Sequence, residues 1–207
     1  IDTNRVASSM ESILQKYPDF LPLFTANILG LDLDSLLIPG NREDQAIRMF
    51  IHDYIPLKDS AGLMYSNFDN ETHDIEEGLK FVKYYFPQYK IPQSVITFIG
   101  PIDANFETSF GVQGDVLTTK SIGIGLQLHM GKYFSFYRST EGMEEYPDFL
   151  SNNFDKEHIS VNAMRNIADD LFPEKIKGRA LIAQMVDRGR RMYLLTKFLP
   201  YTPEYLC

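Results

Sequence analysis

The segment from Val95 to Tyr137 constrains the fold most, because strand-forming residues dominate nowhere else in the chain. Residues 95–99 are β-branched or aromatic, and residues 121–126 alternate small and apolar side chains, which is typical of β-strands. Gly123 and Gly125 would let another backbone or a ligand approach the second strand closely. We therefore expect one small mixed or antiparallel sheet, with strands near residues 95–100, 103–110, 114–119 and 121–128.

Helical periodicity covers most of the remaining sequence. Asn41 is suited to cap a helix, Gly30 to end one, and Pro56 and Pro87 to stop two others. We predict an α+β fold, a mostly helical single domain over residues 1–207 with about seven or eight helices on both sides of the sheet. The helices are expected near residues 6–17, 20–28, 41–54, 75–86, 147–154, 160–172 and 178–199. The residues expected to be largely buried are Leu79, Val82, Phe86, Phe98, Ile99, Ile122, Ile124, Leu181, Met185 and Leu195.

Composition indicates a packed globule that does not bind nucleic acid. The 207 residues are 44% hydrophobic and include no run of 18 apolar residues that could cross a membrane. A net charge of −8 disfavours binding to phosphates, for which a basic face is needed. Arg188, Arg190, Arg191 and Lys197 form the one modest basic cluster, and their near-helical spacing favours a solvated helix face.

Both ends of the sequence suggest that it continues further. Ile1 is not an initiator methionine, so a leading segment, including a signal peptide, is expected before it. Thr202 and Pro203 resemble the first residues of a helix, so a C-terminal continuation is expected after Cys207. This single cysteine cannot form an internal disulfide.

Common catalytic motifs are absent from the sequence. No histidine has a second histidine four residues later, as a zincin metal site needs, and no Gly-x-Ser-x-Gly elbow is present. Residues 125–132 differ from a P-loop in glycine spacing and end before Tyr133, where a serine or threonine is required. The sequence therefore favours a protein without enzymatic activity, metal or cofactor.

One group of polar and aromatic residues at the end of the predicted sheet is the candidate site. It could form a ligand-binding or partner-binding pocket in which His129 acts as acid, base or single metal ligand. Alternatively, Leu126, Leu128 and Met130 point one way, and Gln127 and His129 point the other way, toward solvent or hydrogen-bonding partners. The candidates are Gln127, His129, Tyr133 and Tyr137, with Asp103, Glu107 and Asp115 in the neighbouring loops.

Short motifs spread along the chain, in this order and spacing, resemble the gliding-motility lipoprotein family called GldB. Each motif is weak alone, but together they run over nearly the whole length. They are Lys16-Tyr-Pro-Asp-Phe-Leu21, Asn27-Ile-Leu-Gly30, Phe50-Ile51 with Asp53, Tyr84-Tyr-Phe-Pro87, Thr97-Phe-Ile99, Ile124-Gly-Leu126, Gly131, Phe136-Tyr137, Tyr146-Pro147, Tyr193-Leu-Leu195 and Leu199-Pro200.

The resemblance implies a protein exported by bacteria of the Bacteroidetes group and anchored to the cell envelope by a lipidated cysteine that lies outside this chain. Its domain would then lie outside the cytoplasm, in the periplasm or on the outer membrane. The family also implies a distant similarity to zincin peptidases, so the fold could be a degenerate zincin-like one. Family members have an aspartate where this chain has Gln127, which removes a carboxylate from the candidate site.

The favoured hypothesis is a non-catalytic envelope lipoprotein that supports the assembly or stability of a surface or secretion apparatus, with other envelope proteins as its partners. One alternative is a degenerate zincin-type metallohydrolase that uses His129 with carboxylates from elsewhere in the chain. The other alternative is a small-ligand binding module built from the aromatic and polar residues of the strand segment.

Overall fold

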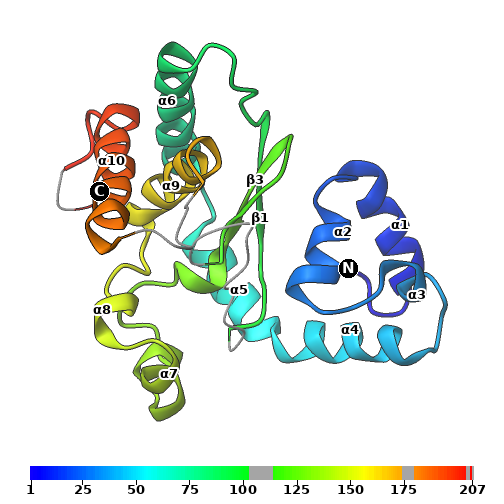
Figure 1. Cartoon of the computed structure of the whole chain (residues 1–207). Coiled ribbons are helices and arrows are strands. Elements are labelled where there is room, and N and C mark those ends of the chain that lie inside the picture. The colour runs from blue at the N-terminus through cyan, green and yellow to red at the C-terminus, as the bar shows by residue number, and fades with distance from the viewer. Residues whose placement is uncertain (103–113, 174–179, 204–205, 207) are drawn as a thin grey trace.

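A small mixed sheet lies between two groups of helices (Figure 1). Its strands, in spatial order, are β1 (Ser94–Phe98), β3 (Ser121–Gly125) and β2 (Val116–Leu117). β1 runs parallel to β3, with Val95 opposite Ile122, and β2 runs antiparallel to β3. The α+β prediction with a central sheet is therefore confirmed. The computed structural model describes residues 1–102, 114–173, 180–203 and 206.

Helices make up most of the described chain. Those before the sheet are α1 (Val6–Lys16), α2 (Leu21–Leu23), the π-helix η1 (Phe24–Ile28), α3 (Leu33–Leu36), α4 (Arg42–Asp53), α5 (Ile55–Met64) and α6 (Asp69–Tyr85). Those after it are the 3₁₀ helices η2 (Leu126–Leu128), η3 (Phe136–Arg138) and η4 (Lys156–His158), and α7 (Thr140–Glu145), α8 (Asp148–Ser151), α9 (Ile159–Leu171) and α10 (Leu181–Phe198). The described ranges hold ten α-helices where seven or eight were expected, and the additional ones are α3, α5 and α7. Helix α5 was missed because Pro56, which lies in its first turn, was expected only to stop the preceding helix.

Local sequence signals explain where several helices begin and end. The Asn41 side chain accepts a hydrogen bond from the Asp44 backbone N–H at 2.8 Å and so caps α4 as predicted. Gly30 has a φ of 64°, a left-handed conformation that glycine adopts at little cost, and the chain leaves its helix there. Pro56 lies in the first turn of α5, where its missing N–H has no helical partner to lose.

One face of the sheet packs against the N-terminal helices. The Phe98 ring of β1 lies 5.3 Å from that of Phe20 and 5.6 Å from that of Phe24, measured between ring centroids. Gly123 of β3 faces the same cluster, and a Cβ at that position would lie 2.8 Å from the Phe20 ring. Glycine therefore lets a side-chain ring approach the strand here, whereas the backbone approach that the sequence predicted occurs at Gly125, where a Cβ would lie 2.6 Å from the Gly114 carbonyl oxygen.

The opposite face of the sheet packs against the C-terminal helices and α6. Ile122 and Ile124 of β3 are fully buried there, in one cluster with Leu79 and Val82 of α6 and Met164 of α9. Figure 1 shows α6 and α9 on the side of the sheet opposite α1 to α4. The central position of β3 explains why all of its residues are buried.

Three details differ from the sequence-based expectation. The strand expected at 114–119 is paired only at Val116–Leu117, and the one expected at 121–128 ends at Gly125, where the 3₁₀ turn η2 begins. The strand expected at 103–110 lies outside the described residues. Leu181 and Met185, expected in the core, are 72% and 60% exposed, because α10 packs on the domain through its other face.

The other core predictions hold. Six of the expected residues are buried, and two at the margins of the core are partly buried. The buried ones are Leu79, Val82, Phe98, Ile122, Ile124 and Leu195, and the partly buried ones are Phe86 and Ile99. In the part of the chain that the structure describes, no helix has both the length and the hydropathy needed to cross a bilayer.

Candidate functional site

The end of β3 carries the polar residues that the sequence singled out. After Gly125 the chain enters η2, so Leu126, Gln127 and Leu128 do not alternate as they would in a strand. Gln127 and His129 are both 0% exposed, and the apolar neighbours on either side of them are buried as well. Of the alternative that these two side chains face solvent or hydrogen-bonding partners, the solvent half is therefore wrong, because it assumed an extended strand at this point, and the hydrogen-bonded half is right.

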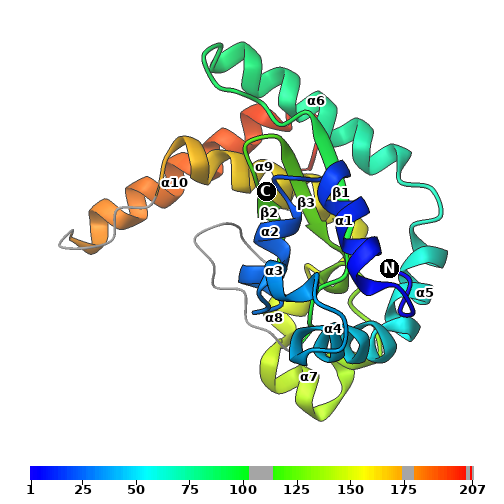
Figure 2. The ribbon, with the colours of Figure 1, turned by 90° about the vertical axis from the view of Figure 1, so that its right-hand side faces the viewer.

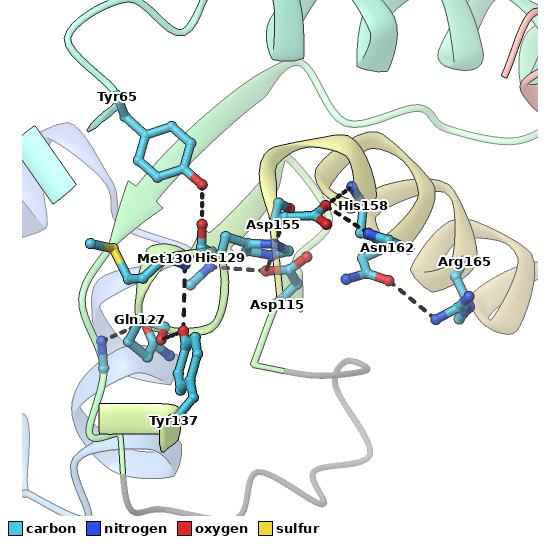
Figure 3. Close-up of polar contacts among 12 residues, drawn as sticks. Tyr65, Asp115, Gln127, His129, Met130, Tyr137, Asp155, His158, Asn162 and Arg165 are labelled. Atoms are coloured by element: carbon cyan, nitrogen blue, oxygen red, sulfur yellow. Dashed lines mark hydrogen bonds and ion pairs between the residues drawn. The ribbon is translucent and has the colours of Figure 1, made fainter. Parts of the chain in front are cut away.

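His129 contacts polar groups through both ring nitrogens (Figure 3). Its Nε2 lies 3.4 Å from Oδ1 of Asp115, and its Nδ1 lies 3.2 Å from the carbonyl oxygen of Asp155. A carbonyl oxygen only accepts hydrogen bonds, so Nδ1 is the donor there, and Nε2 faces the carboxylate without a hydrogen bond to it. The same Asp115 oxygen accepts the Gly125 backbone N–H at 2.9 Å. The imidazole is thus held between the sheet and the segment that leads into α9.

The main chain of His129 is also bound. The Tyr65 hydroxyl, at the end of α5, donates a hydrogen bond to the His129 carbonyl oxygen. Lys156 lies over the Tyr65 ring at 5.0 Å from its centroid and donates to the Met64 carbonyl oxygen at 2.7 Å. Burial raises the pKa of the Tyr65 hydroxyl well above its ordinary value, so this group remains a neutral donor.

Gln127 is enclosed by glycines. Its Oε1 accepts the Gly100 backbone N–H at 2.9 Å, which ties η2 to the end of β1. A Cβ at Gly100, Gly114 or Gly125 would lie 3.0, 3.3 or 2.8 Å from the Gln127 Nε2 atom. A larger residue at any of these positions would therefore crowd the amide. Such a tight enclosure favours a structural role for the side chain over ligand binding.

The two tyrosines of the candidate site lie in different environments. Tyr137 is fully buried, its hydroxyl donates to the Gln127 carbonyl oxygen and accepts the Met130 N–H at 3.4 Å, and burial raises its pKa far above the ordinary value. Its ring centroid lies 5.2 Å from that of Phe154. Tyr133 is 79% exposed and belongs to the surface. The structure therefore brings together Gln127, His129 and Tyr137, but not Tyr133.

The sequence reading missed several partners of this cluster. Asp155 comes from the start of η4, where its Oδ1 accepts the His158 backbone N–H at 3.3 Å and contacts the His158 Nδ1 at 2.7 Å. An aspartate directly before a helix is an N-cap signal that could have located it. Tyr65 lies 64 residues before His129, and no local pattern points to it. Asp115 was named as a neighbouring loop residue, whereas Asp103 and Glu107 lie outside the described residues.

The chemistry available to the cluster is limited by its burial. Asp115 and His129 supply two potential metal ligands, and no group of three or more such side chains converges within the described ranges. Two surface cavities of about 870 and 760 Å³ lie along α10 and α6, and neither is lined by Gln127, His129 or Tyr137. We conclude that these hydrogen bonds join β1, β3, α5 and η4 inside the domain.

Comparison with known protein families gives a match over the full chain. The family described as gliding motility protein GldB matches residues 1–207. Searches among curated proteins and among solved structures found no match. The match agrees with the resemblance that the short motifs gave, and its coverage leaves no part of the sequence unassigned. The chain therefore belongs to the gliding motility protein GldB family.

Proposed function

We propose that this protein is a non-catalytic lipoprotein of the cell envelope that supports the assembly or stability of a surface or secretion apparatus. The observation that carries the proposal is the complete burial of His129 and Gln127. These were the residues of the sequence best suited to act as an acid, a base or a ligand-binding group. An acid or base must lie within hydrogen-bond reach of a substrate proton, and among the described residues these buried side chains bind backbone groups of their own domain.

Family membership supports the part of the proposal that concerns location. A role in gliding motility fits a place at the cell surface, and none of the described helices is long and apolar enough to cross a membrane. A lipid anchor on a segment outside this chain would hold the folded domain at the envelope while leaving its surface free for other proteins. The acidic net charge of −8 fits protein partners better than nucleic acid.

The proposal is tested in a strain from which the gene has been deleted. We expect the deletion to reduce the amount of assembled surface apparatus, measured by co-purification of its components from membranes, and a plasmid copy to restore it. A complementing copy that carries His129→Asn serves as the chemical control, because asparagine retains a donor for the Asp155 carbonyl oxygen.

Two results would count against the proposal. An unaltered envelope in the deletion strain would remove the assembly role. Full-level, folded His129→Asn protein that fails to restore assembly would indicate that the imidazole has a chemical function, and would favour a hydrolase. We expect the amount of assembled apparatus to recover in proportion to the amount of folded His129→Asn protein.

A further inference from the structure

Helix α10 presents an apolar surface that the described domain leaves uncovered. Six apolar residues of its outer face are from 48% to 72% exposed. Successive residues of an α-helix are about 100° apart, so these six lie within an arc of about 140°. Figure 2 shows the first half of α10 extending away from the rest of the domain. We call this surface the α10 stripe; its residues are Leu181, Ile182, Met185, Val186, Met192 and Tyr193.

The centre of the α10 stripe is open to a partner. Gly189 lies in the middle of the arc, and a Cβ built there would meet no atom within 4 Å. Six neighbouring exposed apolar side chains on one helix face are typical of interaction sites, whereas single ones are ordinary on protein surfaces. Met185 and Met192 add flexible, polarizable side chains that adapt to a partner helix.

Positive charges border the stripe on both sides. Arg188 lies along one edge, and Arg190 and Lys197 lie along the other, by the same helical geometry. Arg191 belongs to the domain instead, because it is buried and forms an ion pair with Asp169 at 3.2 Å. The solvated helix face that the sequence predicted for this cluster therefore holds for Arg188 and Arg190, of which Arg190 also pairs with Asp187 at 3.8 Å, but not for the buried Arg191.

A groove runs along one side of the α10 stripe and could receive side chains of a partner. The cavity of about 870 Å³ lies between the end of α9 and α10. Its lining is apolar at Phe172, Val186, Tyr193 and Leu194 and also includes the ion pair of Asp187 and Arg190, whose charged groups lie 3.8 Å apart. A concave, partly apolar surface of this kind accepts side chains from an adjacent helix, as in helix-in-groove complexes. The groove therefore favours a protein partner over a membrane.

We propose that the α10 stripe binds an amphipathic helix of another protein, whose apolar face is flanked by aspartate or glutamate side chains. Cations on both edges of the stripe are complementary to such flanks. A second copy of this chain fits poorly, because two stripes placed face to face would bring their bordering arginines together. The inference rests on the proposed function and names the surface and the kind of partner through which it would act.

The test uses two synthetic helical peptides about as long as α10, with identical leucine and methionine faces. One carries glutamate on both flanks and the other carries lysine. Fluorescence anisotropy with the 207-residue chain should show the glutamate peptide binding about tenfold or more tightly than the lysine peptide, with an affinity that falls as salt is raised.

Gly189→Glu is the diagnostic variant. It places a carboxylate in the middle of the stripe, at a position where a Cβ would meet no atom within 4 Å, and glutamate forms helices better than glycine. We expect binding of the glutamate peptide to weaken about tenfold or more while the melting temperature stays level or rises. Gly62→Glu in α5 is the matched control, because Gly62 is also an exposed helical glycine with open space around it. It should leave binding unchanged.

Each contrary result overturns the inference. Equal binding of both peptides, or equal weakening by Gly189→Glu and Gly62→Glu, would show that the stripe does not select acidic flanks. Binding to vesicles with about a third phosphatidylglycerol, lost in Gly189→Glu, without peptide binding would assign the stripe to a membrane. A dimer abolished by Gly189→Glu would assign it to a second copy. The proposed function fails separately, through an unaltered envelope in the deletion strain.

Discussion

Replacing Tyr137 should reveal how much stability the buried cluster contributes. Tyr137→Phe removes only the hydroxyl, which leaves the Gln127 carbonyl oxygen and the Met130 N–H without this partner inside the domain. Leaving buried groups unsatisfied costs about 1–3 kcal/mol of unfolding free energy. Tyr137→Ala also removes a fully buried ring that packs against Phe154, and that loss amounts to about 3–5 kcal/mol.

Urea unfolding followed by circular dichroism measures both losses. With a slope of about 2 kcal/mol/M, a loss of 4 kcal/mol lowers the midpoint by about 2 M. Tyr133→Ala is the matched control, since this tyrosine is 79% exposed and its removal should cost less than about 1 kcal/mol. The reasoning is refuted if Tyr137→Ala shifts the midpoint no more than Tyr133→Ala does. If Tyr137→Phe leaves the midpoint unchanged, the hydrogen-bond part of the account is wrong.

Other perturbations test separate parts of the structure. Gly125→Ala places a Cβ 2.6 Å from a backbone carbonyl oxygen and should cost about 1–3 kcal/mol in urea unfolding, whereas Gly62→Ala, with open space around it, should stabilise α5 by up to about 1 kcal/mol. The hydrogen bonds from Arg48 hold the pKa of Asp44 below its usual value, so the stability that Asp44 adds is present at neutral pH and is lost as the pH falls below roughly 4. Unfolding curves of wild type and Asp44→Asn should therefore differ at pH 7 and converge in acid; a constant difference would contradict this assignment. Elemental analysis of purified protein should find no stoichiometric zinc, and about one zinc per chain that disappears in His129→Ala would instead favour the hydrolase.

Local patterns predicted the elements of the fold because those patterns report backbone preferences directly. Asn41 caps its helix and Gly30 ends another, since both effects act within a few residues. The same patterns could not show whether an apolar helix face is covered. Leu181 and Met185 recur at helical spacing as core residues do, yet they lie on the uncovered side of α10. Periodicity identifies a face, and only tertiary packing decides what contacts it.

The candidate site was predictable in composition but not in environment. The sequence located Gln127, His129 and Tyr137 at the end of the sheet, and these three do lie together. Their burial depends on the turn η2 and on Tyr65, which approaches from a distant part of the sequence. No spacing rule connects such residues. The sequence therefore suggested a surface pocket, whereas the folded domain has an internal cluster.

The role proposed for His129 is to stabilise the domain without performing any chemistry. It is tested most directly by the amount of assembled surface apparatus per folded molecule in the deletion strain complemented with His129→Asn. Folded protein is quantified by resistance to limited proteolysis, which follows the population of the open state. We predict the wild-type ratio of assembly to folded protein, even if less protein accumulates. A normal level of folded His129→Asn protein with assembly abolished would contradict this role.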